Sequence, residues 1–150
     1  MRAVLTRVNS ASVAIDGEVV GKIGKGFLIL LGVGPDDTEK ECRYLAEKAL
    51  GLRIFTDEND KMNLGLDAVG GEVLVVSQFT LCADCTHGRR PSFTRSAPPA
   101  QANELYEYFT RALGEQGVSH IETGVFGADM AVTLLNDGPV TIILDTKDLK

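Results

Sequence analysis

The chain has 150 residues, of which 44% are hydrophobic and 24% are charged, and its formal net charge is −6. These values are typical of one soluble globular domain, and no apolar run reaches the roughly 18 residues of a membrane-spanning helix. The net acidity argues against broad nucleic-acid binding. Three cysteines and no apolar leader predict a cytoplasmic protein rather than a disulfide-bonded secreted one.

Strand patterns dominate the first part of the sequence. Residues 2–8 and 12–23 are rich in β-branched and apolar side chains, and Asp16-Gly17 predicts a hairpin turn inside the second range. Residues 26–33 form a nearly continuous apolar run, which is typical of a strand buried on both faces.

Two amphipathic helices are predicted further along. Thr38 and Glu41 have the spacing of a capping box, and the apolar positions after them indicate a helix that ends near Gly51. A second helix is expected to begin at Pro98-Pro99, with Ser96 as its cap.

With the remaining apolar segments, the chain is expected to contain about eight strands and two helices, with no linker between domains. This count predicts an α/β, β-rich single domain over residues 1–150, with layered sheet or sheets and both helices on one side. A sheet face without helices would pack on another sheet or on a partner. The remaining strands are predicted at residues 52–55, 72–81, 121–126, 130–135 and 140–144.

Polar side chains interrupt the apolar strand at Ser77-Gln78-Phe79-Thr80. Burying such groups without partners costs about 1–3 kcal/mol each. Two interpretations follow: the groups have a function, or the strand emerges into solvent there.

The segment from Asn136 to Thr141 contains Gly138-Pro139, which would interrupt strand pairing. A bond before proline is the one for which a cis peptide costs least. The segment therefore forms either an unusual backbone turn or an ordinary hairpin.

Two adjacent cations and an aromatic residue follow a glycine in the segment Gly88 to Phe93. Arg89 and Arg90 could meet a phosphate backbone while Phe93 stacks on a base, or all three could lie in a solvated loop.

Familiar catalytic motifs are absent from the sequence. Cys82 and Cys85 lie near His87, but a structural zinc site needs four ligands, and Cys42 falls on the apolar face of a predicted helix. The other histidine, His120, lies in a polar segment, so nothing indicates a Ser-His-Asp triad.

Together these segments resemble one family, the D-aminoacyl-tRNA deacylases, and the resemblance runs along almost the whole chain. The Cys-x-x-Cys motif is not part of the family signature. The segments that carry the resemblance are Arg7-Val8 with Ala11-Ser12-Val13, Ser77 to Leu81, Gly88 to Phe93, Phe126-Gly127-Ala128 with Met130, and Asn136 to Thr141.

The resemblance implies a homodimer that hydrolyses the ester between a D-amino acid, or glycine, and the terminal adenosine of tRNA, while sparing L-amino acids. It implies no metal or organic cofactor, and no membrane or DNA partner. Gly138-Pro139, with a cis bond, would enter the pocket of the other subunit as a chiral selector, and Arg7 would fix its orientation.

The resemblance also implies roles for the other motif residues. Backbone N–H groups of Phe79 and Thr80 would stabilise the oxyanion that forms as water attacks the ester. Thr80 as a nucleophile is the alternative. The implied catalytic residues are Ser77, Gln78, Phe79 and Thr80, the implied substrate-binding residues include Phe126, Met130 and Asn136, and the implied tRNA-binding residues are Arg89, Arg90 and Phe93.

Two other functions stay open on the residues alone. The first is a general esterase that uses Ser77 or Cys85 with a histidine. The second is a non-catalytic dimeric RNA-binding module that uses Arg89, Arg90 and Phe93.

Overall fold

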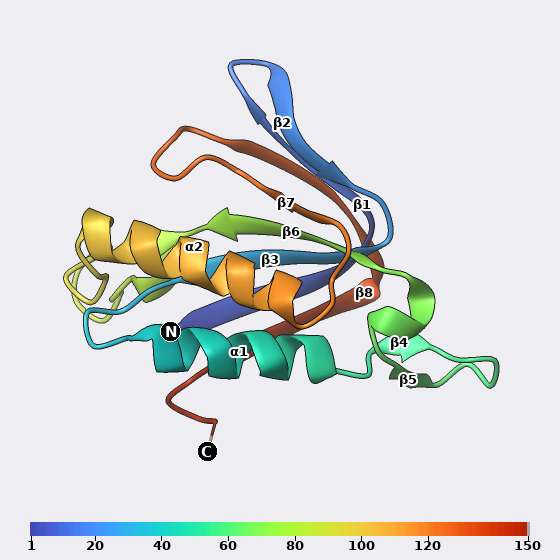
Figure 1. The fold of residues 1–150 in the computed structure, drawn as a ribbon. Coiled ribbons are helices and arrows are strands. Elements are labelled where there is room, and N and C mark those ends of the chain that lie inside the picture. Colours follow the sequence, from blue (N-terminus) through green and yellow to red (C-terminus); the bar gives the residue numbers. More distant parts are fainter. Residues whose placement is uncertain (150) are drawn as a thin grey trace.

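A six-stranded mixed sheet forms the centre of the fold, with its first and last strands side by side (Figure 1). In the computed structural model, which describes residues 1–149, β1 pairs antiparallel with β8 along one edge. Its other edge pairs with β3 and then with β2, and β6 and β7 extend the sheet from β3 in parallel. The strands are β1 (Arg2–Ile15), β2 (Glu18–Ile23), β3 (Gly26–Gly32), β6 (Glu72–Ser77), β7 (Ile121–Thr123) and β8 (Ala131–Asp145).

The sheet curls until its ends nearly meet. A Cβ atom on Gly21 of β2 would lie only 2.7 Å from the carbonyl oxygen of Thr123 on β7, so a glycine is needed at this close approach. The sequence left open whether the domain has one sheet or several, and the structure has one curled main sheet. Its inside is filled by an apolar cluster of Val8, Ala11, Val13, Ile23, Leu28, Leu74 and Val76.

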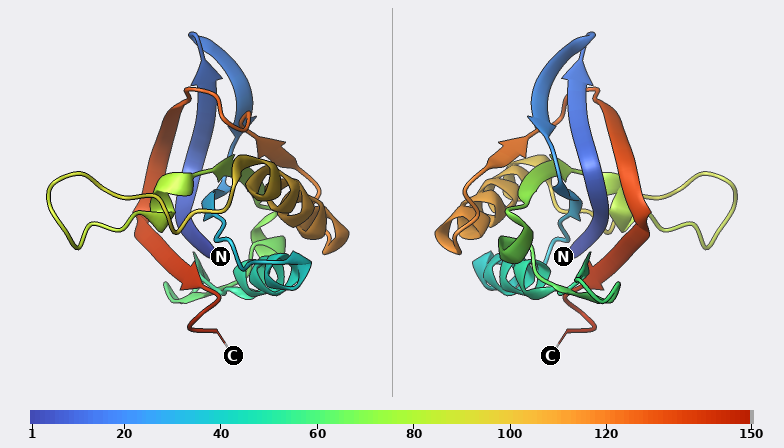
Figure 2. Two further views of the ribbon diagram at one scale, coloured as in Figure 1. Left: turned by 90° about the vertical axis from the view of Figure 1, so that its left-hand side faces the viewer. Right: turned by 90° about the vertical axis from the view of Figure 1, so that its right-hand side faces the viewer.

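Both helices, α1 (Glu39–Gly51) and α2 (Pro99–Glu115), cover the same side of the sheet (Figure 2). Their apolar faces and the sheet enclose the main core, whose largest buried side chains include Phe27, Phe55 and Phe109. No helix among residues 1–149 is long and apolar enough to cross a membrane.

The predicted N-terminal cap is observed for α1 but not for α2. The capping box of Thr38 and Glu41 is formed at the start of α1, which ends at Gly51 as expected. The expected cap of α2 is wrong. Pro98 occupies the N-cap position with no side-chain cap, and the hydroxyl of Ser96 donates to the carbonyl of Ala97 instead. Proline is tolerated here because the first N–H groups of a helix have no intrahelical partner.

Several predicted strands have different limits. The strand expected at residues 52–55 is reduced to β4 (Phe55–Thr56), which pairs with β5 (Met62–Leu64), and a short 3-10 helix η1 (Asp67–Val69) follows. The strand expected at 121–126 ends at Thr123. These short elements lie where the apolar pattern was weakest.

The strand expected at residues 72–81 ends at Ser77, and the chain turns into a second 3-10 helix, η2 (Phe79–Cys82). Pairing with β3 stops at Leu31 and Ser77, and the N–H of Gln78 donates to the carbonyl of Leu31 at 2.8 Å. Gly32 then lets η2 fold over the end of β3, because a Cβ there would lie 2.9 Å from the Cβ of Leu81.

The two strands expected at 130–135 and 140–144 are halves of the single strand β8, so the hairpin alternative for Gly138-Pro139 is wrong. Thr6 pairs with Thr141 and Val8 pairs with Asn136, which leaves residues 137–140 opposite Arg7 alone. These four residues form a bulge in the ladder, named here the β8 bulge.

Candidate functional site

A hollow of about 560 Å³ opens where β6 ends, between the first turn of α2 and the segment that leads into β8. Six of the predicted site residues line it: Ser77, Gln78, Phe79, Phe93, Phe126 and Met130. The other lining residues are Val76, Ser96, Ala97, Pro99, Ala102, Gly127, Ala128, Asp129 and Val132.

Aromatic rings form much of this wall. The rings of Phe79 and Phe93 meet edge to face with centroids 5.0 Å apart, and Phe79 is 55% exposed. Phe126 packs beside Tyr106 at 6.2 Å, and the hydroxyl of Tyr106 donates to the carbonyl of Val75 at 3.1 Å. Apolar and aromatic walls with a few polar groups at one end suit a flat, partly polar ligand such as a nucleobase.

The polar end of the hollow is the start of η2. In this turn Leu81 donates to the carbonyl of Gln78, and Ala83 donates to that of Thr80, both at 3.2 Å. The N–H groups of Phe79 and Thr80 come first in the turn, so they have no partner within it. The side-chain amide of Gln78 donates to the hydroxyl of Thr80, which is exposed beside the residues that line the hollow.

Three contacts, from β1 and from the end of β3, hold η2 in place. Gly32 lies against it, Arg2 donates to the carbonyl of Leu81 at 3.1 Å, and the thiol of Cys82 donates to the carbonyl of Val33 at 3.6 Å. Burial raises the pKa of the Cys82 thiol, so this cysteine is protonated at neutral pH and serves as a packing group.

Among the described residues no nucleophile–histidine pair is formed. His120 lies 3.7 Å from the carboxylate of Glu72 at the beginning of β6, whereas Ser77 ends that strand. His87 and Cys85 are both exposed in the loop after η2. Among residues 1–149 no histidine hydrogen bond reaches Ser77 or Cys85, so the geometry does not favour the general-esterase alternative.

A second cluster of predicted residues surrounds the β8 bulge. Arg7 is 6% exposed, and its Nε donates to the carbonyl of Asp137 at 3.0 Å. Asn136 accepts from the N–H of Val140 at 3.1 Å. The Gly138–Pro139 peptide is cis, as the resemblance implies.

The predicted substrate-binding residues therefore fall into two groups within one chain. Phe126 and Met130 line the hollow, whereas Gly138-Pro139 of the β8 bulge and its neighbours Arg7 and Asn136 do not line it. The dipeptide is exposed on the chain.

The predicted tRNA-binding residues lie on a loop that projects from the body between η2 and α2 (Figure 2). Asp84 and Ser92 bridge its two arms, and Arg95 pairs with Asp84 at 3.1 Å. The hydroxyl and N–H of Thr86, followed by Arg95, hold the pKa of the Asp84 carboxyl below its ordinary value. Arg89 and Arg90 are exposed, while Phe93 turns back to Phe79.

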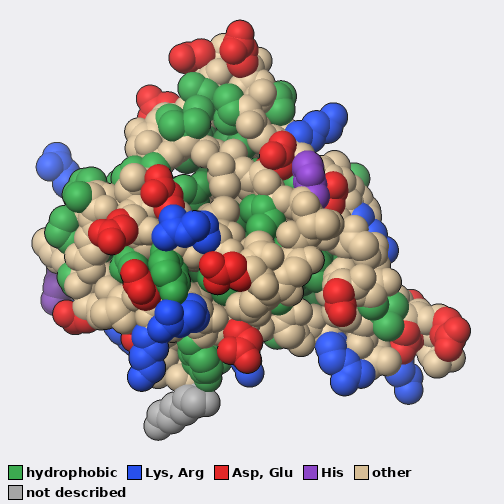
Figure 3. All heavy atoms as spheres, viewed as in Figure 1, with side chains coloured by type: hydrophobic (Ala, Val, Ile, Leu, Met, Phe, Trp, Pro, Cys, Tyr) green, Lys and Arg blue, Asp and Glu red, His purple; other side chains and the backbone are tan. Residues whose placement is uncertain are grey.

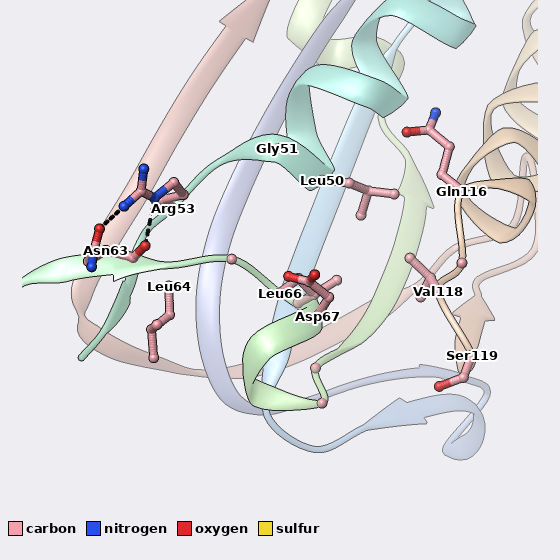
Figure 4. Close-up of a pocket in the computed structure, with 14 residues that line it drawn as sticks. Leu50, Gly51, Arg53, Asn63, Leu64, Leu66, Asp67, Gln116, Val118 and Ser119 are labelled. Carbon is pink, nitrogen blue, oxygen red and sulfur yellow. Dashed lines mark hydrogen bonds between the residues drawn. The ribbon is translucent and has the colours of Figure 1, made fainter. Parts of the chain in front are cut away.

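Another hollow, of about 550 Å³, lies at the C-terminal ends of α1 and α2 beside η1 (Figure 4). Leu50, Leu66 and Val118 line it together with Asp67 and Gln116, and none of the predicted site residues does. On the helical face, acidic and basic side chains are interspersed, without a patch of one sign (Figure 3).

Sequence reasoning did not identify the lining residues at the start of α2. Ala97 precedes the helix and Pro99 and Ala102 lie in its first turn, and these small or rigid residues line the hollow because of where the helix packs. Asp129, between two motif residues, was also overlooked.

Comparison with known proteins is consistent with this arrangement. The profile described as "D-Tyr-tRNA(Tyr) deacylase" matches residues 4–145. D-aminoacyl-tRNA deacylases of Desulfatibacillum aliphaticivorans and Yersinia enterocolitica are 59% and 60% identical, over 98% and 96% of this chain and 100% and 99% of theirs. The chain belongs to the D-aminoacyl-tRNA deacylase family.

Solved structures agree with the fold of this family member. A protein described as c-Myc DNA unwinding element binding protein is 41% identical, with a TM-score of 0.91 over 97% of this chain and 98% of its own. A probable eukaryotic D-amino acid tRNA deacylase is only 18% identical but has a TM-score of 0.82 over 95% of this chain and 97% of its own, so it supports the fold alone.

Proposed function

We propose that this chain hydrolyses the ester bond between a D-amino acid, or glycine, and the 3′-terminal adenosine of tRNA. The observation that carries the proposal is the aromatic hollow, which ends at the unpartnered N–H groups of η2. With the terminal adenine between the aromatic walls, the ester on its ribose would lie at the rim formed by Ser77, Gln78, Phe79 and Thr80.

The chemistry needs little from side chains. An aminoacyl ester is already activated, so the enzyme has to position water and stabilise the developing oxyanion. The N–H groups of Phe79 and Thr80 are suited to the oxyanion. The hydroxyl of Thr80 accepts a hydrogen bond from Gln78 and has no basic side chain beside it among residues 1–149, which favours the backbone role over nucleophilic attack.

The active form is proposed to be a homodimer. Leu134, Leu135 and Ile143 are exposed apolar side chains on β8, the strand that carries the bulge. Pairing two copies through this strand would cover them and would bring Gly138-Pro139 of one subunit to the hollow of the other. There the dipeptide, with Asn136 and Arg7 behind it, would reject an L side chain by steric clash.

Contact with tRNA requires only a local basic surface, because only the 3′ end enters the hollow. Arg89 and Arg90 on the projecting loop would meet backbone phosphates, and Phe93 would contribute to the base pocket. Binding should be modest and salt-sensitive, since the protein as a whole is acidic. A tRNA substrate supports a cytoplasmic location for this activity.

The direct test measures amino-acid release from D-tyrosyl-tRNA, L-tyrosyl-tRNA and glycyl-tRNA by purified protein. Rapid release of D-tyrosine and glycine with L-tyrosyl-tRNA spared is expected. Equal hydrolysis of the D and L esters would instead indicate a general esterase, and tRNA binding without turnover would indicate an RNA-binding module. Either result contradicts the proposal.

A further inference from the structure

The β8 bulge lacks the hydrogen bonds that hold an ordinary strand. Ladder pairing stops at Thr141 and resumes at Asn136, so residues 137–140 depend on side chains for their position. At the Val140 end of the bulge, the side chain of Asn136 accepts a hydrogen bond from the N–H of Val140. At the Asp137 end, a side chain of the neighbouring strand β1 holds the backbone.

Arg7 is the residue that does this. Its Nη1 donates to the carbonyl of Ile54 at 2.6 Å and reaches the hydroxyl of Thr56 at 3.5 Å, which anchors the guanidinium to the body of the protein. Its Nη2 lies 2.7 Å from where a Cβ of Gly138 would be. The guanidinium therefore packs directly against the bulge.

Asp137 contacts this guanidinium twice. Its carbonyl accepts from Nε at 3.0 Å, and its carboxylate Oδ2 lies 3.2 Å from the same atom. Among the ion pairs within residues 1–149, Asp137 supplies the only carboxylate for Arg7. A buried charge is costly without such a partner, so the carboxylate has a reason to stay beside Arg7.

We infer that Asp137 is a positioning residue for chiral discrimination: its carboxylate locks Arg7 and thereby fixes the peptide in front of Gly138-Pro139. The inference rests on the proposed selector role of that dipeptide. Rejection of an L side chain needs oxygen atoms held within a fraction of an ångström, whereas hydrolysis of a D ester needs only the free space. Loss of the carboxylate should therefore relax discrimination and leave catalysis intact.

The test compares the hydrolysis of D-tyrosyl-tRNA and L-tyrosyl-tRNA by the full-length variants Asp137→Asn and Asp137→Ala. The rate on the L ester should rise about tenfold in Asp137→Ala, with a smaller rise in Asp137→Asn, while the D rate stays within about twofold of wild type. Asp137→Glu, which keeps a carboxylate, should restore most of the discrimination. Adding Asp137→Ala to Arg7→Gln should change the ratio no further, because Asp137 acts through Arg7.

A matched control is available on the same two strands. Arg2 of β1 and Asp145 of β8 form an ion pair at 3.0 Å, remote from the bulge in the strand register. Asp145→Asn should keep the wild-type ratio of D to L rates. An equal change of ratio in Asp145→Asn, an unchanged L rate in both Asp137→Asn and Asp137→Ala, or an equal fall of D and L rates would each overturn the inference. A wild-type protein without discrimination would overturn the proposed function instead.

Discussion

Gly32 lies on β3 directly under the turn that carries Thr80. A Cβ at this position would lie 2.9 Å from the Cβ of Leu81 and 3.3 Å from the carbonyl oxygen of Gln78, closer than backbone can tolerate without moving. The position of the N–H groups of Phe79 and Thr80 thus depends on a residue that does not line the hollow.

Replacing Gly32 by Ala is expected to lift η2 and misplace the oxyanion donors. The rate constant for D-tyrosyl-tRNA should fall at least about tenfold, because displacements of about 1 Å are enough to lose a factor of this size. Single-turnover kinetics measures this rate constant. Gly51→Ala is the control, since a Cβ there meets nothing within 4 Å, and its rate should equal wild type. A wild-type rate in Gly32→Ala would argue against η2 as the catalytic element.

Residue-level features differ in how far the sequence reveals them. The positive φ angles of Asp16 and Gly17 follow from a turn signal that the sequence states directly. The burial of Arg7 does not, because an arginine in a strand segment looks the same in the sequence whether its face is buried or exposed. Asp137 was overlooked for a similar reason: its partner is 130 residues away.

The loop between η2 and α2 is the element that presents the arginines. Asp84 ties its arms together: its carboxylate accepts from the Thr86 hydroxyl at 2.7 Å and pairs with Arg95. Asp84→Ala should loosen the loop and raise the KM for D-tyrosyl-tRNA about two- to fivefold, with kcat unchanged, as expected for exposed contacts. Steady-state kinetics over a range of tRNA concentrations separates the two constants.

The control for this loop is Asp57→Ala. Asp57 accepts from the N–H groups of Asn59 and Lys61 in the turn between β4 and β5. The Asp57→Ala variant therefore removes similar contacts in a different loop, and its KM for D-tyrosyl-tRNA should equal that of wild type. The pKa of Asp84 is held low, so its contribution to loop order is present above the ordinary carboxyl range and is lost as pH falls. A fall in kcat with unchanged KM in Asp84→Ala would contradict a role in tRNA binding.

Elements with a complete local pattern were predicted well. The strand at residues 26–33 and the two helices carry their own apolar periodicity, and they form close to the expected limits. The polar side chains from Ser77 onward indicate a change there, but the sequence could not predict that the strand ends at Ser77 and turns into η2, because this end depends on where its pairing with β3 stops. Likewise the segment around Gly138 has the composition of a turn, and only its pairing with β1 on both sides makes it a bulge.

The exposed apolar side chains of β8 bear on the oligomeric state of the protein. Leu135 and Ile143 are 58% and 66% exposed, and they lie on either side of the bulge. A carboxylate placed in a buried apolar interface is strongly unfavourable. Leu135→Asp with Ile143→Asp should therefore yield a folded monomer that has lost deacylation, because each hollow would lack the bulge of its partner.

Sedimentation velocity measures the oligomeric state, and circular dichroism checks the fold. Val125→Asp is the control: Val125 is 49% exposed and follows β7, at the end of the strand order opposite β8. The Val125→Asp variant should stay dimeric. A β8 variant that remains dimeric, or a wild-type protein that sediments as a monomer, would contradict the proposed assembly. Within one chain the predicted site residues fall into two groups, and the proposed dimer would bring them together.

The β8 bulge also restricts how the length of this chain can change. Three residues of β1 lie between Thr6 and Ser10, and five of β8 lie between their partners Leu135 and Thr141, an excess of two. Because side chains alternate along a strand, this count sets which cluster each half of β8 meets: Val132 packs on the cluster inside the curl, whereas Ile142 and Leu144 pack on the core under the helices. Deleting or inserting one residue here would turn half of β8 inside out, so natural length variants should gain or lose residues only in pairs.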